Sequence, residues 1–169
     1  MAFRVETGAI VAGANSLCSV EYARQYHADR QHDKWFERPD EHEAALIRAT
    51  DFLCRRYGIR FQGERVTTTQ ALCWPRRIAV PGLTVLSTEV PTAIQSAVAE
   101  IAYREVLGQA LDTVVDTRLI KSSKVSVGSI SKETTYADGN VKATEQDNRI
   151  DELLRPFLRS SVNVRLQRG

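Results

Sequence analysis

Trp74, Arg76 and Arg77 have the types and spacing that could most readily do chemistry, in the stretch TTTQALCWPRRIAVPG. Proteins that bind single-stranded nucleic acid stack such a ring on a base and contact phosphates with the guanidinium groups. The same residues also suit a scaffold, in which the tryptophan is buried and the arginines face solvent. Because most tryptophans are largely buried, we favour Trp74 as a structural anchor, with Pro75 turning both arginines to the surface.

Histidine and cysteine are the next residue types that could form a metal site or a nucleophile. His27 and His32 are five residues apart, which puts them on different faces of a helix, unlike the i, i+4 pair of a helical zinc site. The cysteines are odd in number and have no CxxC spacing: Cys18, Cys54 and Cys73. We therefore predict no metal site and no disulfide framework, and we interpret the cysteines as buried thiols in a reducing compartment.

Motifs of the common enzyme classes are absent from the sequence. There is no GxxxxGK[ST], no GxGxxG and no GxSxG, so phosphate-loop, dinucleotide-binding and hydrolase interpretations have no support. Carboxylates are abundant only where they favour the starts of helices. We predict that the protein is not an enzyme and that it binds no cofactor.

Length and composition predict one globular domain over residues 1–169, with 43% hydrophobic and 26% charged residues. No apolar run approaches the roughly 20 residues that span a bilayer, and the first residues do not resemble a signal peptide, so we expect no membrane partner. The net charge is only +2, yet arginine is unevenly distributed. The segment from Arg48 to Arg77 contains seven arginines and only two acidic residues. This excess of positive charge suits either a surface for anionic partners or a solvated face.

Hydrophobic periodicity and capping signals predict the helices that must position these side chains. The first spans about Val20 to Gln31 behind the N-cap Ser19, and the second runs from Pro39 to a stop at Gly58. Residues 59–86 are expected to be connecting structure, and a third helix follows from Pro91 to Gly108.

A last short helix is expected from Asp147 to about Leu158, shortened or kinked by Pro156. Residues 116–142 are rich in Thr, Ser and Val, with a turn signal at Asp138-Gly139-Asn140, and predict an extended hairpin. The fold class is thus mainly α (α+β). It comprises a bundle of three to four helices from about residues 19–108 and 147–158, a projecting arm at 116–142 and an extended C-terminal tail at 159–169.

Five stretches occur in the order found in one known family: GANSLCSVEYARQYHADR, AALIRATDFLCRRYGIRFQGER, QALCWPRR, VPTAIQSAVAEIAYRE and IKSSKVSVGSI. Together with ANS at 14–16, RATD at 48–51 and WPR at 74–76, they make the sequence similar over almost its whole length to tailed-phage and prophage proteins. These are labelled DnaT-like single-stranded-DNA-binding proteins and resemble head-tail connector (adaptor) proteins. Leu17-Cys18 departs from the family pattern, in which an aromatic and a small aliphatic residue are expected.

The resemblance to connectors implies a structural virion protein, assembled in the host cytoplasm and located in the neck. It would form a homo-oligomeric ring, expected to be a dodecamer, beneath the portal protein. The ring would extend the channel for packaged double-stranded DNA and dock a tail-terminator or stopper protein. The DNA-binding label implies instead a replication accessory protein that coats single strands. An aromatic content of 7% and a nearly neutral charge favour the connector.

Under the connector interpretation, the tail is expected to join the portal by strand pairing or insertion, through Val162, Val164, Arg165, Leu166 and Arg168. The arm is expected to lie between subunits or to face the channel, through Arg118, Lys121 and Lys124. Carboxylates of a neighbouring subunit are expected to pair with Arg76 and Arg77. Under the DNA-binding interpretation, the strand would contact Trp74, both of these arginines and the arm.

Overall fold

Five α-helices and two antiparallel strand pairs are found in the described part of the chain. The computed structural model describes residues 2–78, 85–109, 111, 120–126, 131–136 and 145–159. The helices are α1 (Val20–Ala28), α2 (Asp33–Phe36), α3 (His42–Tyr57), α4 (Thr92–Val106) and α5 (Glu145–Leu154), with 3₁₀ turns η1 (Pro39–Glu41) and η2 (Arg155–Phe157). The strands are β1 (Glu64–Arg65), β2 (Arg76–Arg77), β3 (Ile120–Ser126) and β4 (Ser131–Tyr136).

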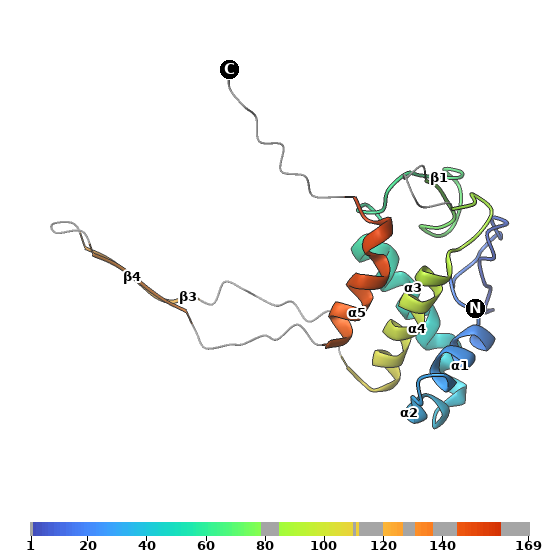
Figure 1. Ribbon diagram of the computed structural model, residues 1–169, viewed down its shortest axis with the longest axis horizontal. Helices are drawn as coiled ribbons and strands as arrows, with labels where there is room; N and C mark the ends of the chain where they lie inside the picture. Colours follow the sequence, from blue (N-terminus) through green and yellow to red (C-terminus); the bar gives the residue numbers. More distant parts are fainter. Residues whose placement is uncertain are drawn as a thin grey trace, which may run out of the picture.

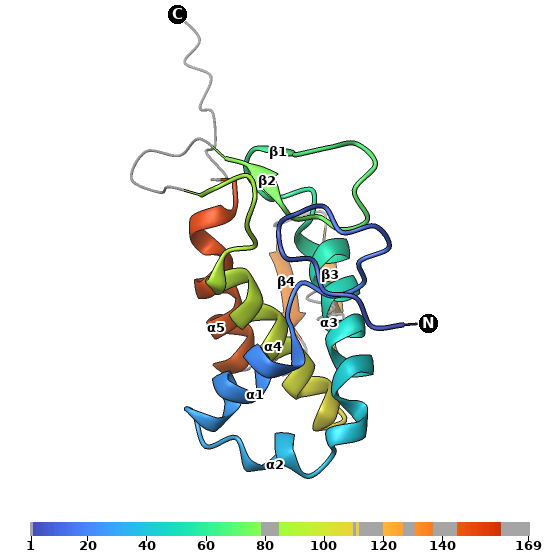
Figure 2. The same cartoon turned by 90° about the vertical axis from the view of Figure 1, so that its right-hand side faces the viewer.

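Helix α4 occupies the centre of the helical body, with α3 on one flank and α5 on the other (Figures 1 and 2). Helix α1 also packs against α4. The core-facing residues of α4 are mostly small or β-branched, including Ala97, Val98, Ile101 and Ala102, all of which are fully buried. Small side chains let neighbouring helices approach closely, so a single core forms around α4.

The helix starts and stops follow the local signals in the sequence. The Ser19 hydroxyl accepts a hydrogen bond from Tyr22 N at 3.1 Å and caps α1. Helix α3 ends at Gly58, whose N–H donates to Cys54 O at 3.0 Å. A Cβ at Gly58 would lie 2.2 Å from that oxygen, so no larger residue fits there without a shift. The predicted shortening by Pro156 is also confirmed, because α5 gives way to η2 after Leu154.

The β3–β4 hairpin confirms the predicted mixed fold class. Its antiparallel register pairs Ile120 with Tyr136, Lys124 with Glu133 and Ser126 with Ser131. The two strands pair with each other and lie apart from the helices (Figure 1). The turn signal predicted at residues 138–140 lies outside the described residues.

The prediction of three free thiols was wrong for two of the cysteines. Cys54 in α3 and Cys73 form a disulfide with their Cα atoms 5.4 Å apart. The long connection after α3 returns beneath the last turn of that helix, and a separation of 19 residues carries no sequence signal for such a return. Cys18 is a free, buried thiol as predicted, and burial raises its pKa. The expectation of a reducing compartment therefore loses its basis.

The two histidines predicted to face apart meet instead. Helix α1 ends at Ala28, and Gln31 adopts a left-handed φ of 54°, so the chain turns back on itself. The two Nδ1 atoms of His27 and His32 then lie 3.0 Å apart. Helical spacing failed here because the helix does not extend as far as the second histidine.

His27 is fully buried between aromatic rings. Its ring centroid lies 4.4 Å from that of Trp35 and 5.2 Å from that of Tyr103. Burial lowers the pKa of His27 to about 3, and the neighbouring charge of His32 contributes to the same shift. The folded protein therefore holds this imidazole neutral at pH values where the unfolded chain would protonate it.

We predict that protonation of the unfolded chain at His27 destabilises the fold in mild acid. As the pH falls below 6.5, the unfolded state binds a proton that the folded state refuses until about pH 3. The free energy of unfolding should then fall by up to about 1.4 kcal/mol per pH unit from this group. Urea denaturation at a series of pH values gives the free energy of unfolding at each pH. This free energy should fall less steeply with falling pH for His27→Gln than for the wild type. Equal slopes would contradict the assignment.

Candidate interaction surfaces

Trp74 lies in the core, fully buried. Its ring makes edge contacts with Phe61 and Phe157, at centroid distances of 5.5 Å and 5.6 Å. These partners come from the segment after α3 and from η2, so the tryptophan joins segments distant in sequence. A base cannot stack on this ring in the folded protein. Its importance as an anchor stays a prediction.

Arg76 is also buried, which corrects the expectation that Pro75 turns it to the surface. Only 6% of the residue is exposed. Its guanidinium donates to four backbone carbonyl oxygens, at 2.9 Å, 3.2 Å, 3.4 Å and 2.8 Å: Gln62, Cys73, Phe61 and Gly63. The irregular connection leaves these carbonyls without strand partners, and the arginine fork supplies their donors. Arg76 is therefore occupied inside the subunit, whereas Arg77 is exposed.

An exposed group of arginines surrounds this buried one, and we call it the arginine end: Arg56, Arg60, Arg65, Arg77 and Arg159. Arg159 N donates to Arg60 O at 2.8 Å, and strands β1 and β2 pair Arg65 with Arg76 and Glu64 with Arg77. Burial lowers the pKa of Arg76, and the charges of Arg159 and Arg65 lower it further, as expected for cations that lie close together. The arginine end is thus assembled from three segments of the chain.

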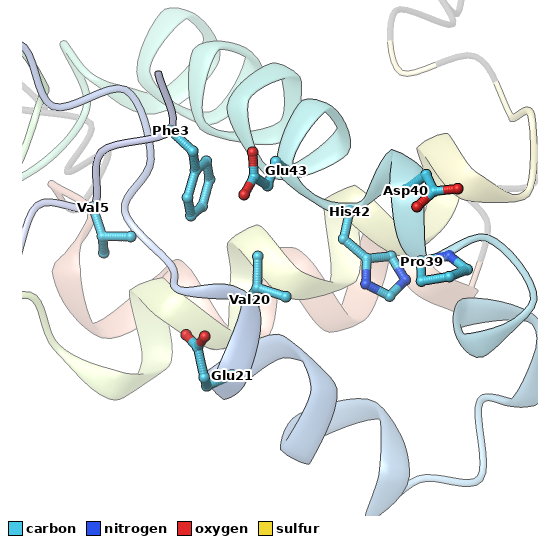
Figure 3. A pocket seen from close by; sticks show the side chains of 8 residues that line it. All are labelled: Phe3, Val5, Val20, Glu21, Pro39, Asp40, His42 and Glu43. Carbon is cyan, nitrogen blue, oxygen red and sulfur yellow. The ribbon is translucent and has the colours of Figure 1, made fainter. Parts of the chain in front are cut away.

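A pocket of about 530 Å³ lies near the other end of α3 (Figure 3). Its apolar lining consists of Phe3, Val5, Val20 and Pro39. The carboxylates of Glu21, Asp40 and Glu43 come from the first turns of α1, η1 and α3. We call this site the acidic pocket.

The acidic residues of this pocket are ordinary helix-start residues that the fold gathers in one place. Carboxylates stabilise the positive end of a helix, and sequence reasoning interpreted them only in that way. His42 does not face solvent, because its Nε2 lies 2.7 Å from Trp35 O and its ring stacks on Trp35. The missed signal was that several successive helix starts each contain an acid. Only the packing of α1 against α3 brings those starts together.

The acidic pocket and the arginine end lie at opposite ends of one helix. Glu43 is in the first turn of α3 and Arg56 in its last turn. A helix of 16 residues is roughly 24 Å long. The acidic pocket and the exposed arginines are therefore separated by the length of α3.

The motifs ANS at 14–16 and RATD at 48–51 have structural roles in this fold. Thr50 of α3 accepts a hydrogen bond from Leu17 N at 3.1 Å, and Asn15 accepts one from Arg4 N at 2.8 Å. Arg48 forms an ion pair with Glu105 of α4. The motifs thus fasten the N-terminal segment and α4 to α3.

The remaining predicted contact residues are only partly described. Lys121 and Lys124 belong to β3, with Lys121 at an irregularity in the register and Lys124 opposite Glu133. Arg118 and the tail residues lie outside the described residues: Val162, Val164, Arg165, Leu166 and Arg168. Their assigned contacts stay predictions.

Metal sites and membrane spans were also sought in the described ranges. No group of three or more His, Cys, Asp or Glu side chains there is placed to hold a metal ion. Within those same ranges, no helix has the length and apolar character needed to cross a bilayer.

Comparison with known proteins gives one match. The family model described as "Putative DnaT-like ssDNA binding protein" matches residues 1–169. No curated protein and no solved structure matches the chain.

We predict that adjacent substitutions at positions 76 and 77 have very different effects on stability. Arg76→Met removes four hydrogen bonds to carbonyl oxygens, of which those to Phe61 and Cys73 are buried, and should lower the free energy of unfolding by about 3 kcal/mol. Arg77→Met, at the exposed neighbour, should change it by less than about 0.5 kcal/mol. Equilibrium urea denaturation measures both values. Similar losses of unfolding free energy in the two variants would show that the hydrogen bonds of Arg76 contribute no more to stability than the exposed Arg77 does.

Proposed function

The chain belongs to the family of DnaT-like ssDNA binding proteins, and from this premise we propose that it is a head-tail adaptor of a phage virion. It is a structural subunit that assembles with copies of itself into a ring beneath the portal protein. The ring extends the channel for packaged double-stranded DNA and offers a docking surface to a tail-terminator or stopper protein.

The observation that carries this proposal is the placement of the β3–β4 hairpin. The hairpin is inserted between α4 and α5, two helices that pack directly on each other, and it lies apart from the body (Figure 1). The two helices that flank the insertion both contribute buried side chains to one core, among them Ile101 of α4 and Ile150 of α5. An isolated two-stranded hairpin is at best marginally stable, and both of its outer edges can pair with further chain. Neighbouring subunits of a ring would supply the missing contacts.

The charge distribution of the helical body also supports an assembling subunit. Proteins that coat single strands combine a continuous basic groove with exposed aromatic rings. In the described residues, three acidic side chains instead line a pocket at the start of α3, whereas exposed arginines stand at and after its last turn. Among the side chains outside residues 112–148 whose exposure is described, Phe36 is the one aromatic of the exposed large hydrophobic residues. Self-association through opposite charges fits this surface better than strand coating does.

Single-stranded DNA binding is the second candidate, and the description of the matching family favours it. The site postulated for it from the sequence is largely unavailable, because Trp74 and Arg76 are both buried. What remains for phosphate contact is the arginine end and the lysines of the hairpin. Such a surface would bind nucleic acid through charge alone.

We predict that the arm is required for assembly and dispensable for folding. Replacing residues 116–142 by a short Gly-Ser linker should leave the thermal transition of the helical body within a few degrees, since α4 and α5 pack directly on each other. The same variant should fail to occupy the neck in electron micrographs of virions. Removing residues 162–169 should likewise abolish portal attachment. A variant without the arm that still fills the neck would refute this role of the hairpin.

We predict weak, strongly salt-dependent binding to a labelled single-stranded oligonucleotide in fluorescence anisotropy, as expected from charge alone. Phe36→Ala, which removes the exposed ring, should change the affinity by less than about twofold. Arg77→Ala serves as the matched cationic control and should weaken binding modestly. Tight binding that depends on an aromatic side chain would favour the second candidate over the adaptor.

A further inference from the structure

Ile59 is a large hydrophobic side chain that is 85% exposed, more than Phe36 or Leu86. It lies in the turn that follows α3, where Arg60 N donates to Tyr57 O at 2.8 Å. This hydrogen bond closes the turn and helps to hold the isoleucine away from the core. A lone exposed isoleucine is common on protein surfaces, so its meaning depends on what surrounds it.

Cationic side chains flank Ile59. The guanidinium groups of Arg56 and Arg60 lie 5.7 Å and 5.4 Å from the ring centroid of Tyr57, which precedes the isoleucine by two residues. The backbone of Arg159 joins that of Arg60. We call this arrangement of an apolar tip between cations the isoleucine knob: Arg56, Ile59 and Arg60.

The acidic pocket has the complementary features. Phe3 and Val20 are partly exposed and form an apolar lining, and the carboxylate of Glu43 lies beside Phe3 (Figure 3). Glu21 and Asp40 add two further carboxylates. The helix starts account for the acids but not for apolar side chains left open to solvent among them. A partner with an apolar tip and flanking cations would cover both features at once.

We propose that the isoleucine knob of one copy docks in the acidic pocket of a second copy. Ile59 would contact Phe3 and Val20, and its flanking arginines would pair with the carboxylates. Charge complementarity between two surfaces of the same chain identifies this occupant. The carboxylates would repel a nucleic-acid backbone from the pocket.

The geometry of this contact is head to tail. The two surfaces are at opposite ends of α3, so each copy uses one surface and leaves the other free for the next. A contact of this kind produces a ring when the rotation closes and an open chain when it does not. The inference deepens the proposed function, because it names the lateral contact of the ring, and for its meaning in the virion it rests on that proposal.

The test is sedimentation velocity of the full chain over a range of protein concentrations at low ionic strength. The wild type should form multimers that dissociate as salt is added. Ile59→Glu, Glu43→Arg and Arg60→Glu should each weaken self-association at least tenfold. Leu86→Glu is the matched control, because Leu86 is another exposed large hydrophobic residue, at 57%, and it lies outside both surfaces. This control should associate like the wild type.

Mixing two charge-reversal variants gives the sharpest result. Glu43→Arg and Arg60→Glu should each be impaired alone, whereas an equimolar mixture should regain multimers. The reversed pocket of one variant then meets the reversed knob of the other, and their two unaltered surfaces also match. Circular dichroism of each variant verifies that it is folded.

Three results would overturn the inference: a wild type that is monomeric at every concentration, single variants that associate normally, or folded variants whose mixture does not recover. None of these decides the proposed function, which depends on portal attachment and neck occupancy. Conversely, multimers with the expected variant pattern, formed by a chain that does not attach to portals, would uphold the contact and refute the adaptor role.

Discussion

The burial of α4 is the constraint on which the rest of the helical body depends. This helix packs against α1, α3 and α5, so most of its surface is removed from water, including the polar residues Glu100 and Arg104. A carboxylate in such a position must find partners, and Glu100 receives hydrogen bonds from Tyr26 of α1 at 2.7 Å and Arg149 of α5 at 3.0 Å. These bonds fix two neighbours of α4 at one place on its length and thereby set how the helices align.

The sequence predicted the elements whose causes are local. Ser19 caps α1, Pro39 opens a 3₁₀ turn before α3, and Pro156 ends α5, each through contacts within a few residues. The features that sequence reasoning missed depend on residues far apart. Arg76 is buried because carbonyls of residues 61–63 converge on it from the other side of a connection. Because arginine is charged, a surface position was the better prediction for Arg76. Its burial depends on the path of the backbone, which the sequence does not reveal.

The candidate surfaces also include one that the sequence indicated and others that depend on residues far apart in the chain. An arginine-rich segment was evident from composition, and the fold gives its members different surroundings: Arg76 is buried, Arg48 pairs with Glu105, and Arg77 is exposed. The acidic pocket could not be predicted, because Phe3, Glu21 and Glu43 belong to three segments whose meeting depends on tertiary packing. The exposure of Ile59 could not be predicted either, since the residues adjacent to it in sequence do not distinguish an exposed apolar residue from a buried one. Patterns in a sequence report which face of a helix is apolar, but not which segments meet beyond its ends.

The insertion of the hairpin between two helices in mutual contact has a consequence for how such chains diverge. Because α4 and α5 are packed together, the points where the arm leaves and re-enters the body are held at a fixed spacing. The entropy of closing a loop grows only slowly with its length, so lengthening or shortening the arm costs the body little. Arm length and arm sequence are therefore free to change independently of the core. Related chains can thus carry arms of different length on the same helical body.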